Sequence, residues 1–518
     1  MHGAHGATTT RTLVDPFYLF LDLVAALAPG QVFLLDAAQD DTSVPYRMSL
    51  IGALPVLEIQ VKEGRVALVV ESGLGLHLRA QLMLHGHQAV EFVPGMFVPS
   101  SVIDGETLFF EPRDPMALLD DIRRVVRSLV DAPGEQPPFT RGLLGYLGYD
   151  AAHYLEQLPK STQDDRGVPD IRLQWHAALV QMTGREISLF DSMSALQGVM
   201  APAAWQRLSE RLERVKRVLT SDPGEMENRL GTFGVSGDVL PPDVRVTEDV
   251  SQADYEASIR RAQQYIQAGD IFQVVLSKRM RIEKRLHHYD AYERLRRLNP
   301  SPYMFVAEYP DMRLFGASPE VQFRAVNGVA EMKPIAGTSK GRGQSKEEDM
   351  RLQQQLLDDE KECAEHLMLV DLCRNDLGRV CAVGSVHVAQ FMTVEPYSHL
   401  FHLVSTVRGQ LRPDVNVFHA LLATFPAGTL SGAPKIRAME IIDELEIFRR
   451  GPYGGLLGMV DFDANANTAI IIRTVVEVND EYYVQVGAGI VADSDPAQEW
   501  LECGHKAGAV VDVLTGRR

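Results

Sequence analysis

Cysteine is scarce in this chain of 518 residues, and its pattern excludes two kinds of protein. The four cysteines, at positions 363, 373, 381 and 503, form no CxxC pair and no cysteine–histidine cluster with the spacing of a zinc site. Disulfides persist in oxidising compartments, so reduced cysteines in a cytoplasmic protein are the simplest interpretation. We therefore expect neither a zinc fold nor a disulfide scaffold.

Long hydrophobic runs and an excess of positive charge are also missing. Asp22 interrupts the apolar stretch near the N-terminus, and no uncharged run of about 18 residues follows, so we expect neither membrane insertion nor export. The 51 basic and 69 acidic residues give a formal charge of −18, which argues against a nucleic-acid-binding protein. With 45% hydrophobic and 23% charged residues, the composition is that of a folded globular protein.

The length predicts two to four domains, at roughly 100–200 residues each. Strand-like runs alternate with helical patterns from residue 13 to about 220. Residues 221–250 are rich in glycine, proline and acidic residues, which is typical of a linker or long connection. Residues 251–512 contain many strand patterns joined by short turns. This order favours an antiparallel α+β arrangement over parallel βαβ units.

One predicted helix combines acidic and apolar residues unusually. The segment DEKECAEHLMLVDLCRND (359–376) carries Glu362 and Glu365 just before a turn that is apolar on every side. Such a turn is normally buried, whereas an ionised carboxylate removed from water costs several kcal/mol or more unless it is compensated. We therefore expect a partner that holds both carboxylates inside the protein.

A second predicted helix carries the same spacing near the C-terminus. Asp495 and the proline after it form a helix start, and Glu499, Glu502 and Lys506 then lie on one helical face. A solvated face with a Glu502–Lys506 ion pair explains this pattern when it is considered alone.

Two glutamate pairs together favour a metal interpretation. Four converging carboxylates repel one another, but a divalent cation with a preference for oxygen ligands turns that repulsion into coordination. Mg²⁺ also retains water ligands and readily accepts a further oxyanion. The sequence therefore predicts a magnesium site that presents a carboxylate substrate.

Three glycine-rich segments could supply backbone amides to an anion. The first, FPAGTLSGAPK, precedes an amphipathic helix, and helix N-termini favour anions, although the GxxxxGK[ST] pattern is absent. The second, PIAGTSKGRG, ends a strand, and the third, GAG, lies inside one. Simple turns and a strand bulge remain open alternatives. The residues concerned are Thr429, Gly337, Thr338, Gly487 and Gly489.

Three further polar residues occupy unusual positions. His402 lies in the apolar strand pattern LFHLVSTV, where a hydrogen-bonded core histidine is the default interpretation. Arg473 lies in the run AIIIRTVV, which predicts an arginine inside an apolar strand and hence an anionic partner. Glu320 follows a strand and, alone, is a plausible turn carboxylate.

Together these segments resemble the chorismate-utilising enzymes, and most closely the component I subunits of anthranilate synthases. The resemblance is dense from about residue 255 to 510, through GDIFQVVLSKR, NPSPYMF, GASPE, PIAGT, EKECAEHLMLVDLCRNDLGRV, HLVSTVRG, FPAGTLSGAPK, RRGPYGGLLG, IIIRT, QVGAGIVADSDP and ECGHKA. It implies large, mostly antiparallel sheets with helices packed outside. It also implies a regulatory and structural region at 13–220 and a catalytic region at 251–512.

The resemblance further implies a reaction and a site. Chorismate and ammonia would yield anthranilate and pyruvate in tryptophan biosynthesis, in a lyase reaction that uses Mg²⁺ and no redox cofactor. Glu320 would assist loss of the ring 4-hydroxyl, Thr338 would lie near that hydroxyl, and His402 would act in pyruvate elimination. Implied substrate contacts are Gly337, Thr429, Tyr453, Arg473, Gly487, Gly489 and Lys506, and implied metal ligands are Glu362, Glu365, Glu499 and Glu502.

Two positions help to choose among related enzymes. Isochorismate-forming members carry a lysine as base where this chain has Gln273, and an amide cannot serve as that base. Aminodeoxychorismate synthases often carry PIKGT where this chain has Ala336, so component I of that enzyme is the nearest alternative. A non-catalytic chorismate- or tryptophan-binding regulatory chain is a second. No GxCxGxQ signature surrounds any cysteine, so a glutamine amidotransferase subunit is the implied partner.

The resemblance also implies a feedback site for L-tryptophan. Its positions are Ala37, Arg47, Ser49, Pro302, Tyr303 and Met304. The chain reads LLDA at 34–37 where LLES is expected, so we expect tryptophan inhibition to be weak or altered. His505 replaces the asparagine of the related ECLNKA, and nothing in the sequence explains that change.

Overall fold

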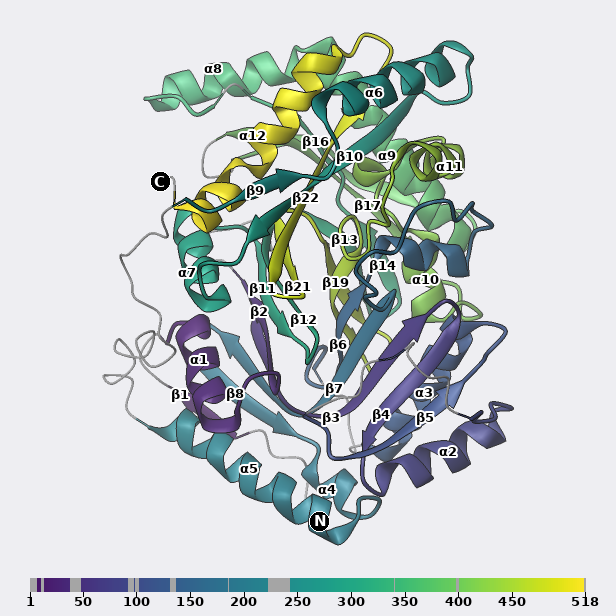
Figure 1. Cartoon of the computed structure of the whole chain (residues 1–518), viewed down its shortest axis with the longest axis vertical. Coiled ribbons are helices and arrows are strands. Elements are labelled where there is room, and N and C mark those ends of the chain that lie inside the picture. The colour runs from purple at the N-terminus through teal and green to yellow at the C-terminus, as the bar shows by residue number, and fades with distance from the viewer. Residues whose placement is uncertain are drawn as a thin grey trace.

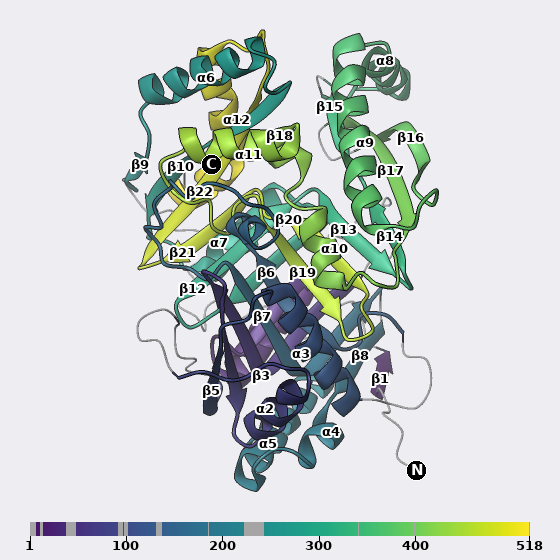
Figure 2. The ribbon, with the colours of Figure 1, turned by 90° about the vertical axis from the view of Figure 1, so that its right-hand side faces the viewer.

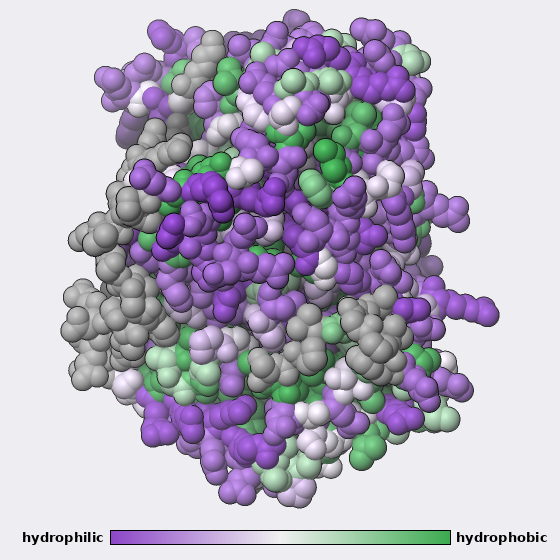
Figure 3. Space-filling view, in the orientation of Figure 1, coloured by the Kyte–Doolittle hydropathy of each residue, from purple (hydrophilic) through white to green (hydrophobic). Residues whose placement is uncertain are grey.

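The computed structural model describes residues 7–10, 14–37, 48–91, 97, 102–130, 137–184, 186–221, 243–339, 341–396 and 400–516. Strands occupy the middle of the molecule and helices lie around them (Figure 1). The face in Figure 3 is mostly hydrophilic, with apolar residues scattered across it. Among the described residues, no helix is both long enough and apolar enough to cross a membrane. All four cysteines are free.

The first part of the chain forms eight strands and five α-helices within the described residues. They are β1 (Ala7–Thr10), α1 (Pro16–Leu27), β2 (Val32–Asp36), β3 (Ser49–Lys62), β4 (Arg65–Glu71), α2 (Leu74–Leu84), β5 (Gly105–Phe110), α3 (Pro115–Leu129), β6 (Gly142–Leu147), the 3₁₀ helix η1 (Tyr149–Tyr154), β7 (Ile171–Thr183), β8 (Glu186–Asp191), α4 (Met193–Gln197) and α5 (Pro202–Thr220).

The second part begins after residue 242. Its elements are β9 (Val246–Glu248), α6 (Gln252–Gln267), β10 (Gln273–Glu283), α7 (His288–Leu298), β11 (Tyr303–Glu308), β12 (Met312–Ser318), β13 (Val321–Val326), β14 (Val329–Met332), β15 (Ile335–Thr338), α8 (Lys346–Leu357), α9 (Glu360–Val380), β16 (His387–Pro396), β17 (Phe401–Gln410), α10 (Val417–Ala423), the 3₁₀ helix η4 (Gly428–Leu430), β18 (Gly432–Ala433), α11 (Lys435–Leu445), β19 (Leu456–Asp461), β20 (Ala466–Ile470), β21 (Thr474–Val478), β22 (Glu481–Ile490) and α12 (Pro496–Thr515).

The long strands β3 and β7 are the branch point of the sheet. They pair along their length, with a register shift between Pro55 and Leu57. On one side of this shift the pairing continues through β2, β11, β12, β21, β22 and β10. On the other side it continues through β6, β19, β20, β13, β14 and β17. All these pairings are antiparallel, which confirms the predicted α+β class with helices outside.

The two parts of the chain share this sheet directly. Strand β2 pairs with β11, and β6 pairs with β19. The fully buried Arg172 of β7 adds a polar link, because it bonds to Glu58 on β3 and to Asp311 between β11 and β12. Most of the predicted connection at 221–250 falls outside the described residues. The division into a regulatory and a catalytic region therefore stays a prediction.

The helices that carry the glutamate pairs begin where the sequence predicts. Asp359 caps α9 by accepting hydrogen bonds from the backbone N–H groups of Lys361 and Glu362, at 3.0 and 3.1 Å. Asp495 caps α12 by accepting from the Gln498 N–H at 2.9 Å. These caps satisfy N–H groups that lack partners within the helix and so fix each helix start. In Figure 2, α9 and α12 lie on opposite sides of the upper half of the molecule.

One predicted strand is wrong. The run AIIIRTVV is not a single strand, because β20 ends at Ile470 and β21 begins at Thr474. Arg473 lies in the turn between them with φ of +50°. This left-handed conformation is uncommon for a residue other than glycine, and it redirects the chain between the two strands.

Candidate active site

The glutamates of α9 and α12 interact electrostatically across the two helices. Burial raises the pKa of Glu365, and Glu362 on the same helix and Glu502 on α12 raise it further. Burial, followed by the nearby Glu502 charge, also raises the pKa of Glu499. Each of these carboxylates therefore lies near enough to at least one other to repel it.

The burial expected for the first pair is wrong in part. Glu362 is half-buried, whereas Glu365 exposes much of its surface, although enough protein surrounds its carboxylate to raise its pKa. In the following turn Leu367 is 48% exposed, and only Leu369 and Val370 face the core. Helix α9 is therefore anchored along one side only, which leaves its acidic face open.

The acidic residues suit a metal by their chemistry, although they do not enclose one. Among the described residues, no three histidine, cysteine, aspartate or glutamate side chains are grouped closely enough to hold an ion. Lys506 partly compensates the charge, because its Nζ lies 2.7 Å from Glu502 Oε1 and donates to the Gly487 carbonyl at 3.1 Å. Carboxylate oxygens on two facing helices are ligands that Mg²⁺ accepts.

Thr338 and His402 face each other on neighbouring strands and connect to the acidic helix. They are register partners in β15 and β17, and the Thr338 N–H donates to Glu362 Oε2 at 3.0 Å. His402 Nδ1 lies 3.0 Å from the Gly337 carbonyl oxygen. A carbonyl only accepts, so Nδ1 carries the proton and Nε2 the lone pair.

His402 is therefore equipped to accept a proton. Burial lowers its pKa, so the ring is neutral at neutral pH. The side chain is only half-buried, which differs from the core histidine that the sequence also allowed.

Glu320 has the opposite property, because it holds a proton at neutral pH. Burial raises its pKa to about 8, although the Thr429 hydroxyl and the charge of Arg473 both act to lower it. Thr429 Oγ1 donates to Glu320 Oε1 at 3.4 Å. A carboxylic acid with this pKa can give a proton to a leaving oxygen.

The glycines of β22 permit close approach and do not form a bulge. The pairing of β22 with β10 runs without a register shift from Val274 to Glu283, which excludes the bulge alternative. A Cβ at Gly487 would lie 2.9 Å from Tyr453 Oη, and one at Gly489 would lie 2.4 Å from Gln273 Nε2. Gly487 needs glycine, because a Cβ there would also lie 2.8 Å from the backbone carbonyl oxygen of Leu276. At Gly489 the crowding atom is the end of the flexible Gln273 side chain.

Contacts and charge interactions link the predicted residues of the site, which come from nine segments of the chain. Glu362, Thr338 and His402 form one chain of contacts, Thr429 and Glu320 a second, and Gly487, Lys506 and Glu502 a third. The charge of Arg473 acts on both Glu320 and His402. Tyr453 packs in a cluster with residues of η4 and β20. The arrangement places a proton donor, a proton acceptor and cationic groups in one region.

Sequence similarity identifies the family of this chain. A sequence model described as chorismate binding enzyme matches residues 106–512. This chain belongs to that family. Anthranilate synthase component 1 of Acetivibrio thermocellus is 43% identical over 383 residues, which cover 73% of this chain and 76% of that protein. The corresponding protein of Aquifex aeolicus is 41% identical, covering 79% and 81%.

Solved structures agree with the family assignment. Anthranilate synthase component I of Streptococcus pneumoniae superimposes with a TM-score of 0.71 and 30% identity, covering 91% of this chain and 94% of that one. The menaquinone-specific isochorismate synthase of Escherichia coli has a TM-score of 0.59 at 17% identity, covering 94% and 95%, and so shares the fold. The resemblance found in the sequence is confirmed.

Some residues that organise the site of this chorismate-binding enzyme escaped the sequence analysis. Arg450 is 2% exposed and donates to the Leu430 carbonyl at 2.6 Å and the Val275 carbonyl at 2.7 Å, which ties η4 to β10. Lys435 and Asp376 form a buried ion pair of 2.7 Å between α11 and α9. In the sequence, the only sign of these contacts was a charged residue beside a glycine-rich or apolar segment.

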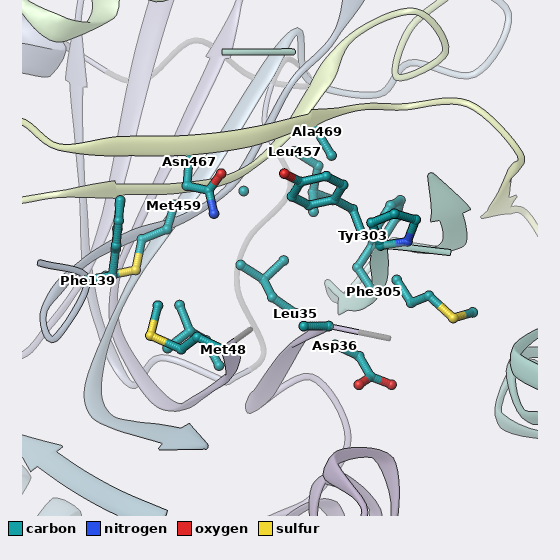
Figure 4. Close-up of a pocket in the computed structure, with 15 residues that line it drawn as sticks. Leu35, Asp36, Met48, Phe139, Tyr303, Phe305, Leu457, Met459, Asn467 and Ala469 are labelled. Carbon is teal, nitrogen blue, oxygen red and sulfur yellow. The ribbon is translucent and has the colours of Figure 1, made fainter. Parts of the chain in front are cut away.

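Four of the six predicted tryptophan positions line a cavity of about 50 Å³ (Figure 4). That volume is several times the roughly 10–15 Å³ that holds one water. Ala37, Pro302, Tyr303 and Met304 line it, and Ser49 lies beside it, accepting from the Ala37 N–H at 3.1 Å. Arg47 lies outside the described residues.

Distant segments complete this cavity and were not predicted. In Figure 4, Phe139, Met459 and Asn467 face Tyr303, Phe305 and Asp36 across it. Burial raises the pKa of Asp36 to about 6, and its Oδ2 lies 3.0 Å from Arg296 Nε. His505 is exposed on α12, and nothing in the structure explains why it replaces asparagine.

Proposed function

We propose that this chain is the synthase subunit of an anthranilate synthase, converting chorismate and ammonia to anthranilate and pyruvate in tryptophan biosynthesis. The observation that carries the proposal is the pairing of a protonated Glu320 with a neutral His402 in one site. Such a pair supplies an acid for one elimination and a base for the other. The names of the relatives support the same activity.

Glu320 serves the first half of the reaction. Ammonia adds at ring C2, the double bonds shift, and the C4–O bond breaks with its electron pair going to oxygen. The Glu320 proton moves to that oxygen, so water leaves in place of hydroxide. Thr338 lies beside His402 and near this hydroxyl. The product of this half is 2-amino-2-deoxyisochorismate.

His402 serves the second half. Its Nε2 takes the proton from C2, and the bond to the enolpyruvyl oxygen breaks, so pyruvate leaves and the ring becomes aromatic. The Gly337 carbonyl holds the ring through Nδ1–H, which fixes the tautomer that this step needs.

The substrate carboxylates lie against the glycines of β22 and the cations near them. Gly487 and Gly489 allow close backbone approach, while Lys506, Arg473 and the Tyr453 hydroxyl supply positive charge and a hydrogen-bond donor. Thr429 and Gly337 complete the contacts. Mg²⁺ would be held by Glu362, Glu365, Glu499 and Glu502, and when bound it supplies the positive charge that fixes the ring carboxylate next to C2.

The nitrogen comes from a glutamine amidotransferase subunit. No cysteine of the chain lies in a glutaminase signature, and free ammonia replaces the partner in vitro. Four free cysteines fit the reducing cytoplasm, where we place the complex. Tryptophan is the proposed ligand of the cavity in Figure 4.

Aminodeoxychorismate synthase component I is the alternative enzyme. Ala336 lies in β15, next to Gly337 and Thr338, where those enzymes often have lysine. Its small apolar side chain favours the anthranilate reaction, which needs no amine from the protein beside the ring.

Product identification tests the proposal. The purified chain is incubated with chorismate, Mg²⁺ and ammonium at alkaline pH, and the products are separated and identified. Anthranilate with equimolar pyruvate is expected. Formation of 4-amino-4-deoxychorismate or isochorismate, or recovery of unchanged chorismate, would each assign the chain to a different function.

A further inference from the structure

A small chamber lies behind Glu320. It measures about 20 Å³, close to the roughly 10–15 Å³ that one water needs. Its walls come from β13, the segment after β14, α9 and the loop at η4. The polar residues among them are Glu320, Gln322, Lys333, Cys373, Asp376 and Thr429.

Gln322 marks the chamber as a binding site. The residue is 2% exposed, and its Nε2 donates to the Thr424 carbonyl at 3.0 Å. This bond fixes the amide orientation, because only the NH₂ group can donate. Oε1 is buried and has no hydrogen-bond partner, which costs about 1–3 kcal/mol unless a ligand satisfies it.

The other polar walls also favour a hydrogen-bond donor. Asp376 is 5% exposed, and its Oδ2 accepts from Lys435 Nζ at 2.7 Å. Lys333 Nζ forms an ion pair of 3.0 Å with Glu395 Oε2. Burial, Asp376 and Glu320 raise the pKa of Cys373, so its thiol stays neutral. The chamber therefore fits one small molecule that donates hydrogen bonds to Gln322 and Glu320.

We propose that the chamber binds a water that returns a proton to Glu320 after each turnover, with Gln322 as the residue that positions this water. The inference rests on the proposed function. Glu320 loses its proton when the C4–O bond breaks, and the nitrogen that bonds to C2 releases one proton to solvent. One proton then passes from solvent through the chamber water to the carboxylate, so the step balances.

The position of the chamber favours water over ammonia. Glu320 lines it, and Glu320 is the proposed acid for the leaving hydroxyl. The position where water-using relatives carry their base is Gln273, on β10 beside Gly489. Gln273 therefore marks the side from which the nucleophile attacks the ring, and the chamber lies on the side of the leaving hydroxyl. The groups that act on the pKa of Glu320 are Arg473 from the β20–β21 turn and Thr429 from η4, and neither can supply a proton repeatedly.

Gln322→Leu tests this role, because leucine keeps most of the volume and removes the acceptor. We expect kcat with chorismate and ammonium to fall about tenfold. The solvent deuterium isotope effect on kcat rises from near 1 to about 3 as proton return becomes rate-limiting, while KM for chorismate stays within about twofold. Met332→Leu changes an apolar wall of the same chamber and leaves the isotope effect unchanged.

Several results would overturn the inference. One is an unchanged isotope effect in Gln322→Leu; another is a rise in KM for ammonium alone, which would make the chamber an ammonia site. A high-resolution structure of the unsubstituted protein decides the matter even if the variant fails to fold, because it must show water between Gln322 Oε1 and Glu320. A dry chamber contradicts the inference. Failure of the unsubstituted chain to form anthranilate would instead refute the proposed function.

Discussion

Burial gives chemically identical side chains different roles at the scale of single residues. Burial raises the pKa of Glu320 to about 8 despite the nearby charge of Arg473, so this side chain holds a proton near pH 7. Glu362, in contrast, accepts a backbone hydrogen bond at the open end of α9, and its carboxylate faces other carboxylates. In the proposed function, the first environment makes Glu320 an acid, and the second provides carboxylate oxygens for a metal.

The raised pKa of Glu320 predicts the pH dependence of the reaction. At constant ammonia concentration, kcat/KM should fall as the pH rises through about 8, because the acid loses its proton. Thr429→Val removes a hydrogen bond that stabilises the ionised Glu320 carboxylate. The pH at which kcat/KM falls should therefore be higher in this variant. Measurements of kcat/KM between pH 6 and 10 check both expectations. An identical fall of kcat/KM with pH in Glu320→Gln would refute the role of Glu320 as the acid.

Ala37 predicts a second outcome at this scale. Because its methyl group lines the cavity where a hydroxyl is expected, the unsubstituted enzyme should show weak tryptophan inhibition. Ala37→Ser restores a hydrogen-bonding group and should lower the inhibitory concentration about tenfold. The assay is anthranilate formation against tryptophan concentration. Inhibition of the unsubstituted chain at low micromolar tryptophan would contradict this reading.

At the scale of elements, local signals located the helices but not the break between the consecutive strands β20 and β21. Asp359 and Asp495 are capping residues with neighbours in sequence, so both helix starts were predictable. The break at Arg473 was not, because tertiary contacts hold an arginine at positive φ inside an apolar run. Gln322 was also missed, since an unpaired buried amide depends on segments that are far away in sequence.

The ion pair between α9 and α11 predicts a stability effect. Lys435→Met leaves the buried Asp376 carboxylate without its partner and should lower the free energy of unfolding by about 3–5 kcal/mol. The double variant Asp376→Leu/Lys435→Met should recover most of that loss, because neither charge then remains buried. Denaturant unfolding of the three proteins measures both. Equal stability of the single variant and the unsubstituted chain would show that the pair is not needed.

At the scale of the whole molecule, the sheet makes the two parts of the chain interdependent. Composition predicted a boundary at 221–250 and strand patterns predicted the α+β class, but no local signal indicated that β2 pairs with β11 or β6 with β19. Such pairings between distant strands depend on the complete fold. The cavity in Figure 4 follows from them, because its walls come from both parts.

A truncated chain tests this interdependence. Residues 243–518 alone would leave β11 and β19 each with an unpaired edge and would expose the apolar face that covers β3 and β7. We expect this fragment to aggregate or remain partly unfolded, as measured by circular dichroism and limited proteolysis. A soluble, active fragment would instead support an autonomous catalytic region.

The division of the reaction between Glu320 and His402 is the central claim, and His402→Asn tests it most directly. The variant keeps the acid and loses the base, so with chorismate, Mg²⁺ and ammonium it should consume chorismate and accumulate 2-amino-2-deoxyisochorismate. Pyruvate release should fall by about 10²–10⁴-fold. Time-resolved product analysis by mass spectrometry and a pyruvate assay follows both compounds. Anthranilate and pyruvate formed at the rate of the unsubstituted enzyme would contradict the account.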